Sequence, residues 1–388
     1  MIIDIYSTLF INIIITAFIG IIIIFYIFKL YKNTKSFQAL LEFPPNYKFN
    51  SNYLDVIKEN TLLTHMEKFC TENNIFANGV IISLSGGVDS MVTLAMLIHL
   101  RNKYKFPIFA ASIDYGLREE SSMESEFLKT YCRTMDIILY VSYIKGISRK
   151  KEDSGSRTEF EEGSRTIRFD TYKKIISENN LSSECGVFVA HHMDDIVENI
   201  FTNSMRGANL LDLEVMKQIS TIHGVKLFRP LLPFKKDSIY DFSHTYNVPY
   251  FLDTTPKWSR RGKMRNEIFP LLDNVFGVAW RDKLKQLGDQ SNAWENYINN
   301  NIIDNWYNEC KVEDNDIIIP IRMEPKAIYH IILAKTIHST GQHMIKNTSV
   351  NKLMEAIITK PTKMITLDAG RIANISDNKI YISWPKKV

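Results

Sequence analysis

Apolar positions divide the middle of the chain into short apolar runs that alternate with longer amphipathic stretches. The runs have the length of strands and predict strands at residues 80–84, 108–113, 137–143 and 187–190. The amphipathic stretches predict helices at residues 91–101, 123–133, 159–176 and 196–205. Regular alternation of strand and helix is typical of a parallel sheet with helices on both faces. We therefore expect an α/β fold with a doubly wound, mostly parallel sheet.

The pattern changes on either side of this region. A helix at 54–73 is expected to lead into the sheet domain, and the chain beyond residue 270 becomes mostly helical. The last part predicts strands at 316–321, 364–367, 371–376 and 380–384, with helices at 326–339 and 350–359. We expect a sheet domain over 61–275, a helical connector over 276–312 and a small α+β domain over 313–388.

The N-terminal residues predict a membrane anchor. Leu9 to Phe28 is almost entirely apolar, and about 20 such residues can cross a bilayer as a helix. A cleaved signal peptide fits less well, because no basic residue precedes the run and no small-x-small cleavage site follows it. Lysines follow the run, whereas Asp4 precedes it, so the positive-inside rule puts the remainder in the cytosol. We predict a single-pass anchor over 1–30 and a linker over 31–60.

Composition narrows the function classes only slightly. The 388 residues are 45% hydrophobic and 23% charged, which is typical of globular domains. The net charge is only +4, so any basic surface that binds nucleic acid must be local. The four cysteines are scattered and form no Cys-x-x-Cys pair, so they do not support a zinc or iron–sulfur site built from such pairs.

The strongest chemical signal is a glycine loop between the first predicted strand and the helix that follows. It reads Ser85-Gly86-Gly87-Val88-Asp89-Ser90. Backbone N–H groups and a helix N-terminus in such a loop bind phosphate, and glycine lets the backbone approach the anion. The hydroxyl groups of Ser85 and Ser90 add donors, and Asp89 either caps the helix or holds a metal ion that shields phosphate charge.

This loop differs from the Walker loop, because no Gly-x-x-x-x-Gly-Lys-Ser/Thr string occurs in the chain. The phosphate lysine of that motif is therefore missing. The alternative interpretation is an ordinary glycine turn before a capped helix, since Gly-Gly turns are common. The complete six-residue string, placed between a strand and a helix, favours a nucleotide site.

A second cluster, His191-His192-Met193-Asp194-Asp195, follows the strand at 187–190 and opens a helix. Its residue types suit a divalent metal site, and histidine also suits acid–base or positioning chemistry near neutral pH. An N-capping aspartate with solvent-facing histidines is the alternative. The carboxyl ends of parallel strands lie at one edge of a sheet, so the loops after Leu84, Ile113 and Ala190 are expected to meet there.

Other candidates are weaker. Asp114 ends the second strand, where a residue can contact a bound nucleotide, although Asp-x-Gly turns are ordinary. Arg165 and Arg168 lie three apart on a predicted helix and suit phosphate, although surface salt bridges are common. The segment 253–265 surrounds one tryptophan with cations, which suits phosphate contacts and base stacking, although a solvated basic loop has the same composition.

Taken together, these motifs resemble the tRNA(Ile)-lysidine synthase family of the PP-loop ATP pyrophosphatase superfamily. The resemblance covers roughly Ile75 to Leu272, and its motifs occur in the family's order. They are Ser85–Ser90, Ser112–Arg118, Ser164–Phe169, His191–Asn199, Met205–Gly207, Arg229–Leu232 and Arg261–Leu272. The tail resembles that family's first C-terminal domain only weakly. The resemblance implies a PP-loop, adenine nucleotide alpha hydrolase-like fold.

The resemblance also implies a reaction and a set of site residues. ATP would adenylate the wobble cytosine of a CAU-anticodon tRNA, and L-lysine would then displace AMP. The implied nucleotide-binding residues are Ser85, Gly86, Gly87, Val88, Asp89, Ser90 and Asp114, and the implied catalytic residues are Asp89, His191, Asp195 and Arg165, with Arg168 as the alternative to Arg165. Mg²⁺ would be held by Asp89 and Asp195, and tRNA by Arg206, Arg260, Arg261, Lys263 and Arg265 together with the C-terminal domain.

Several positions depart from the family pattern. Ser112 and Tyr115 stand where the family has histidines, Asn199 replaces a threonine, and Gly262 replaces an asparagine. The predicted anchor is foreign to the family as well. Two other functions stay open: a PP-loop tRNA thiolase, and a membrane-tethered RNA-binding protein that has lost its activity. The oligomeric state is left open.

Overall fold

The computed structural model describes residues 41–42, 60–114, 120–144, 154–182, 184–252, 259–313, 316–341, 344–359 and 364–384. The predicted anchor over 1–30 lies outside these residues, as does all but a few residues of the predicted linker. Among the described segments, no helix is both long enough and apolar enough to span a bilayer. Residue contacts divide the chain into two compact units.

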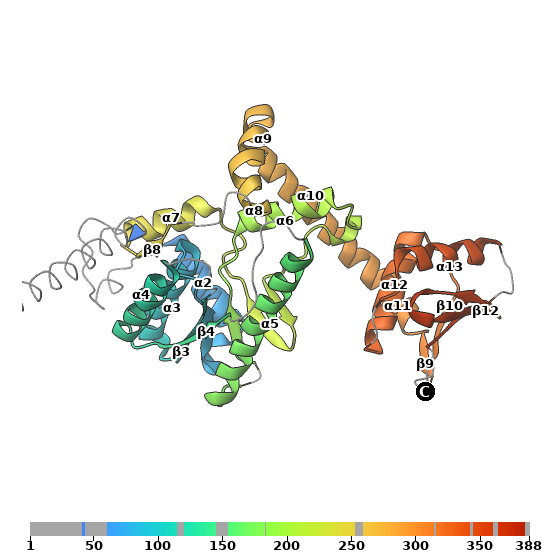
Figure 1. Cartoon of the computed structure of the whole chain (residues 1–388), viewed down its shortest axis with the longest axis horizontal. Helices are drawn as coiled ribbons and strands as arrows, with labels where there is room; N and C mark the ends of the chain where they lie inside the picture. Colours follow the sequence, from blue (N-terminus) through green and yellow to red (C-terminus); the bar gives the residue numbers. More distant parts are fainter. Residues whose placement is uncertain are drawn as a thin grey trace, which may run out of the picture. The chain divides into compact units, whose positions relative to one another are not determined.

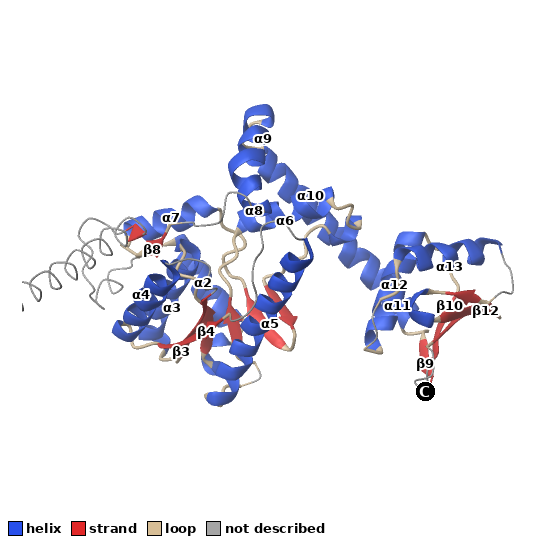
Figure 2. Ribbon diagram, in the orientation of Figure 1, coloured by secondary structure: helices blue, strands red, loops and turns tan. Residues whose placement is uncertain are grey.

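The first unit consists of residues up to Glu198 and of Met216–Val278. Its strands are β1 (Leu41–Glu42), β2 (Val80–Ser83), β3 (Ile108–Asp114), β4 (Ile138–Tyr143), β5 (Gly186–Phe188), β6 (Ile219–Ile222), β7 (Val225–Phe228) and β8 (Tyr250–Phe251). Its helices are α2 (Thr61–Glu72), η2 (Ile75–Asn78), α3 (Val88–Tyr104), α4 (Glu120–Thr134), α5 (Ser154–Glu178), the first part of α6 (Met193–Met205) as far as Glu198, α7 (Lys236–Thr245), α8 (Arg260–Lys263), the π-helical turn η4 (Met264–Ile268) and α9 (Phe269–Phe276). Figures 1 and 2 show these elements.

The main sheet of this unit has the strand order β4-β3-β2-β5-β7-β6. The strands from β4 to β7 run parallel, and β6 pairs antiparallel with β7 at one edge. The sequence-based expectation of a mostly parallel α/β sheet is therefore confirmed. Most element bounds agree within a few residues; α3 begins three residues earlier than predicted, because its first turn is polar and lies within the glycine loop.

Helices cover both faces of this sheet because successive strand residues point to opposite sides. Ile82 of β2 belongs to the core that includes α2, α3, α4 and α7, whereas its neighbour Ile81 packs with Tyr172 of α5. Figure 1 shows α3 and α5 on opposite sides of the strands. With both faces covered, the carboxyl edge of the strands is left for loops, and this is where ligands bind in open α/β sheets.

The second unit consists of Asn199–Val215 and of the chain from Ala279 onward. Its helices are η3 (Leu210–Asp212), α10 (Trp280–Ile298), the π-helical turn η5 (Asn299–Ile303), α11 (Asp304–Tyr307), α12 (Lys326–Ser339), α13 (Asn347–Thr359) and η6 (Asp368–Gly370). Its strands β9 (Lys311–Glu313), β10 (Asp316–Pro320), β11 (Ile365–Thr366), β12 (Ile372–Ser376) and β13 (Lys379–Ser383) form an antiparallel sheet in the order β11-β12-β13-β10-β9.

A separate apolar core holds this second unit together. Trp306 and Tyr329 are fully buried in it, and they pack edge to face with ring centroids 4.9 Å apart. The indole N–H of Trp306 donates to the carbonyl of Pro320 at 2.8 Å, so its polar atom is satisfied despite burial. The mixture of helices and an antiparallel sheet agrees with the α+β pattern expected for the C-terminal residues.

Candidate nucleotide-binding site

The glycine loop after β2 is held in shape by its own hydrogen bonds. The hydroxyl of Ser90 donates to the carbonyl of Gly87 at 3.0 Å and accepts from the backbone N–H of Ser85 at 3.2 Å. Gly86 has a φ of +83°, and a Cβ there would lie 2.5 Å from the Phe251 ring. Only glycine fits this position, because both the backbone angle and the contact exclude a side chain.

The loop presents the N-terminus of α3. Gly87 is the N-cap residue and Asp89 lies in the first turn, so Asp89 does not cap the helix. The first N–H groups of a helix have no partner within it and carry partial positive charge, which favours an anion. The buried hydroxyl of Ser90 braces the loop, while the exposed Ser85 lies on its surface. The string thus forms a tight loop at a helix N-terminus, a geometry that suits phosphate, and the binding of nucleotide by these residues stays a prediction.

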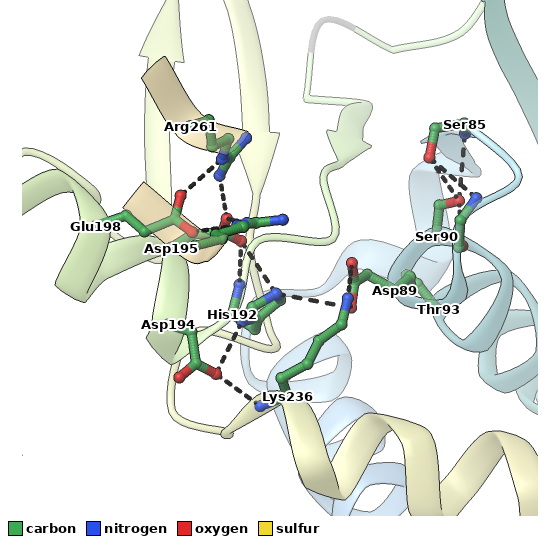
Figure 3. Close-up of polar contacts among 12 residues, drawn as sticks. Ser85, Asp89, Ser90, Thr93, His192, Asp194, Asp195, Glu198, Lys236 and Arg261 are labelled. Carbon is green, nitrogen blue, oxygen red and sulfur yellow. Dashed lines mark hydrogen bonds and ion pairs between the residues drawn. The ribbon is translucent and has the colours of Figure 1, made fainter. Parts of the chain in front are cut away.

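The histidine–aspartate cluster lies beside this loop, because β5 and β2 are neighbouring parallel strands. His192 is 3% exposed, and its Nε2 lies 3.7 Å from Asp89 Oδ1 and 3.5 Å from Asp195 Oδ2. Its Nδ1 lies 3.4 Å from Asp194 Oδ2. Figure 3 shows the imidazole between the three carboxylates. The expectation that these two loops meet at one sheet edge is confirmed.

Two arginines of the basic segment pair with the carboxylates of α6. The Nε of Arg261 lies 2.6 Å from Glu198 Oε2, and another guanidinium nitrogen of Arg261 contacts Asp195. The Nε of Arg265 contacts the other oxygen of Glu198. Burial alone would raise the pKa of Asp195, but His192 and Arg261 outweigh burial and lower it. Asp195 is therefore held as an anion.

His191 points to a different partner from its neighbour. Its Nδ1 accepts a hydrogen bond from Nε of Arg229 at 3.1 Å. The guanidinium of Arg229 also donates to the carbonyl of Lys217 and to the hydroxyl of Ser220, each at 2.8 Å. Burial, reinforced by the charge of Arg229, lowers the pKa of His191 to about 4, although Asp195 works in the opposite direction. The ring is thus neutral at physiological pH.

Lys236 is a site residue that sequence reasoning missed. Its ammonium lies 2.6 Å from both carboxylate oxygens of Asp89 (Figure 3). Its backbone N–H donates to Asp194 at 2.8 Å, and the N–H of Met193 donates to the carbonyl of Phe234 at 2.8 Å. Its place in the sequence could have indicated it, because Lys236 lies four residues after the end of the Arg229–Leu232 motif.

Magnesium fits this site as an ion that arrives with a nucleotide. Among the described residues, no group of three or more histidine, cysteine or acidic side chains forms a ready metal cage. Asp89 and Asp195 nevertheless place carboxylates on either side of one imidazole, next to the phosphate cradle. Mg²⁺ is commonly held by one or two carboxylates together with substrate phosphates, so this donor set is suitable.

The structure gives the other predicted site residues no contact with the glycine loop or the histidine–aspartate cluster among the interactions described above. Asp114 ends β3 beside β2, at the same sheet edge as the loop. Arg165 is exposed on α5 and lies over the Phe169 ring, and among described residues it makes no ion pair with the site. Arg206 is exposed just after α6, and Arg260 and Lys263 are exposed on α8. Their roles stay predictions.

The cysteines form no reactive group. Cys70, Cys132 and Cys185 are buried, and burial raises the pKa of each thiol to about 12. Cys310 is half-buried, and burial raises its pKa as well. Since the thiolate is the nucleophile, these thiols are inert at neutral pH.

A doubly wound sheet with a glycine-loop phosphate cradle at its carboxyl edge defines a nucleotide-binding α/β protein. Residues 58–272 match the PP-loop domain family, and the chain belongs to that family. The match covers the strands of the main sheet, the glycine loop and the histidine–aspartate cluster. The superfamily suggested by the motifs is therefore confirmed.

Curated relatives also support the resemblance noted in the sequence. The chain is 29% identical over 195 residues to a tRNA(Ile)-lysidine synthase of Enterococcus faecalis, covering 50% of this chain and 40% of that protein. It is 31% identical over 220 residues to a tRNA(Ile)-lysidine synthase of Chlamydia caviae, covering 56% and 65%. The matched region thus spans less than two thirds of the length of either relative.

Solved structures are less similar. A U34-tRNA thiolase, NcsA from Methanococcus maripaludis, superposes with a TM-score of 0.46 at 16% identity, covering 61% of this chain and 79% of that one.

Proposed function

We propose that this chain is an ATP-dependent tRNA-modifying ligase that joins L-lysine to the wobble cytidine of a CAU-anticodon tRNA. The observation that carries the proposal is the meeting of Asp89 and Asp195 across the buried His192, beside the glycine loop. The curated relatives named tRNA(Ile)-lysidine synthase support the choice of substrate. ATP binding is supported by the match to the PP-loop family.

The reaction needs two displacements. In the first, the carbonyl oxygen of the cytosine attacks the α-phosphate of ATP, and pyrophosphate leaves. In the second, the lysine amine attacks the ring carbon that bears the adenylated oxygen, and AMP leaves. The first step is needed because a carbonyl oxygen is a poor leaving group. Binding and orientation by the protein contribute most to such phosphoryl chemistry.

Each part of the site suits one task. The loop from Ser85 to Ser90 and the N-terminus of α3 bind the phosphates and stabilise the departing pyrophosphate. Mg²⁺ held by Asp89 and Asp195 would neutralise charge on the phosphate oxygens. Asp114 lies at the same edge, where it is available to the nucleoside.

His191 suits an orienting role better than that of a general base. Arg229 can only donate hydrogen bonds, so the lone pair on Nδ1 of His191 is occupied and the ring proton is on Nε2. A neutral ring in this tautomer donates from Nε2 to an oxygen and cannot accept a proton there. We infer that it orients the base carbonyl or a phosphate oxygen.

The cations of α8 divide into two groups. Arg260 and Lys263 are exposed and available to tRNA phosphates, as is Arg206 after α6. Arg261 forms ion pairs with Asp195 and Glu198. We therefore propose that it contacts the tRNA only at the part of the tRNA that enters the site around these two carboxylates. Arg165 is proposed to contact phosphate from α5.

The alternatives have less support. A thiolase commonly uses paired cysteines or a cluster, and the three buried thiols with a pKa of about 12 are unsuited to carry sulfur. A retired RNA-binding protein does not need a loop whose Gly86 excludes any other residue. A single-pass anchor over residues 1–30, with the catalytic part in the cytosol, is proposed on the apolar run alone. Carbonate extraction of membranes from cells that express the full chain tests the anchor.

The test of the activity is transfer of labelled lysine. The full chain, ATP and Mg²⁺ are incubated with labelled L-lysine and a tRNA that bears a CAU anticodon. The expected product is labelled tRNA, absent with a GAU-anticodon control and lost in Asp89→Ala. Unlabelled tRNA from protein that binds ATP would count against lysine transfer, and labelling with a sulfur donor in place of lysine would favour the thiolase.

A further inference from the structure

The pair of Lys236 and Asp89 links two segments that are 147 positions apart in the chain. Lys236 is the first residue of α7, and its ammonium contacts both oxygens of Asp89 in the first turn of α3. This places a cation directly at the helix N-terminus where the glycine loop binds phosphate. Neither the loop itself nor its resemblance to a known family had indicated a lysine here.

The backbone of Lys236 is held by a hydrogen bond, and its side chain is partly exposed. Asp194 accepts from the N–H of Lys236 at 2.8 Å, and the neighbouring turn is tied by the bond from Met193 to Phe234. The side chains of Lys236 and Asp89 are 27% and 26% exposed. A pair with this exposure contributes little to stability, because water screens it and two flexible side chains must be ordered. Folding alone therefore gives no strong reason for the contact.

The chemistry of the loop does give a reason. ATP brings a chain of negative charge to the N-terminus of α3, and the loop has no lysine of its own, unlike the Walker loop. Asp89 on its own would repel the phosphates. A magnesium ion that arrives with ATP needs a carboxylate, and Asp89 can provide one only if its present cation moves away. The ammonium then lies next to phosphate oxygens that need a counter-charge.

We propose that Lys236 is the phosphate-binding lysine of this site. In the nucleotide-free chain it neutralises Asp89; when magnesium-bound ATP enters, the ammonium leaves Asp89 for the β- and γ-phosphates and the carboxylate takes the metal ion. The four-carbon side chain allows this exchange while the backbone stays fixed by Asp194. The proposal rests on the proposed ATP site but requires neither tRNA nor lysine transfer.

The test is equilibrium binding of nucleotides to the full chain by calorimetry. Lys236→Met is compared with Lys235→Met, which removes an exposed cation from the adjacent position. For Lys236→Met we expect ATP and pyrophosphate to bind at least about tenfold more weakly, with AMP changed less than twofold, since AMP lacks the phosphates concerned. Lys235→Met is expected to bind all three ligands as the unmodified chain does.

Lys236→Arg shows whether the loss in Lys236→Met comes from the missing charge or from a less stable chain. Because it keeps the cation, it should recover most of the ATP affinity. Two results would overturn the proposal. One is equal or tighter binding of magnesium-bound ATP by Lys236→Met, which means that the lysine only competes with the metal for Asp89. The other is an equal loss of AMP and ATP binding, which means that the pair merely holds the loop. If the chain transfers no lysine but Lys236→Met still binds ATP more weakly and AMP normally, the proposed function fails and this inference stands.

Discussion

The Nε of Arg229 lies 3.1 Å from Nδ1 of His191, and this contact determines where the histidine proton resides. An arginine side chain has donors only, so Nδ1 must accept and Nε2 must carry the hydrogen. Burial next to that cation lowers the pKa of His191 to about 4. The site therefore contains one neutral imidazole with a known tautomer, which yields a first prediction.

His191 is expected to stay neutral from pH 8 down to about pH 5. Its pKa is below the unfolded value of about 6.5, so the unfolded chain binds the proton more readily. The contribution of neutral His191 to stability is therefore full above pH 6.5 and falls as the pH drops from 6.5 toward 4. NMR titration of its ring, assigned with His191→Gln, measures the pKa. A midpoint for His191 near its unfolded value of about 6.5 would contradict the geometry.

A second prediction concerns the glycines of the loop. Gly86→Ala places a Cβ 2.5 Å from the Phe251 ring on a backbone with φ of +83°, so the loop must distort. The left-handed backbone alone costs about 1–2 kcal/mol, and ATP binding should be lost with it. Gly87→Ala is the matched control, because its φ is −70° and the nearest atom to a Cβ is 3.6 Å away. Calorimetry with ATP and urea unfolding measure both effects, and equal behaviour of the two variants is the adverse result.

Loss of Arg261 should destabilise the chain although half of its side chain is exposed. Asp195 and Glu198 are each about 6% exposed, and removing Arg261 leaves Arg265 as the remaining arginine for both. We expect Arg261→Met to lower the free energy of unfolding by about 1–3 kcal/mol. Arg260→Met, one position earlier and exposed, should change it by less than about 0.5 kcal/mol. Urea denaturation distinguishes them, and similar values for both would show that the ion pairs matter little.

The exposed cations of α8 should contribute to tRNA binding and have no effect on ATP binding. Arg260→Ala combined with Lys263→Ala is expected to weaken tRNA binding and to reduce the slope of its salt dependence by about two. Lys173→Ala, an exposed lysine on α5, is the control and should change neither quantity. Filter binding over a range of salt concentrations measures the slope. An unchanged slope would remove α8 from the tRNA surface.

The sequence predicted the strands well because buried parallel strands are continuous apolar runs. Val80–Ser83 and Ile108–Asp114 were located from apolar content alone, and Lys326–Ser339 was placed at both ends. Helix starts within functional loops were less accurate. The first turn of α3 contains Asp89 and Ser90, which read as loop residues, so the predicted start came too late.

The site was predictable only where its residues are neighbours in sequence. The loop and the histidine–aspartate cluster were found because each is a compact string after a strand. Lys236 was missed because its partner Asp89 is 147 positions away and only the fold brings them together. Likewise, Arg261 was assigned to tRNA from its basic neighbours, while the structure pairs it with Asp195 and Glu198. A run of basic residues indicates a basic surface. It does not show which of those residues pairs with a buried carboxylate from a distant part of the chain.

Pyrophosphate release measures whether this site splits ATP when tRNA is bound. The full chain is mixed with ATP, Mg²⁺ and a CAU-anticodon tRNA, with and without L-lysine, and pyrophosphate is measured over time. We expect no release of pyrophosphate without tRNA, at most one equivalent per tRNA without lysine, and steady turnover when ATP, tRNA and lysine are all present. Release that is independent of tRNA, or none from protein that binds both ligands, would contradict this expectation.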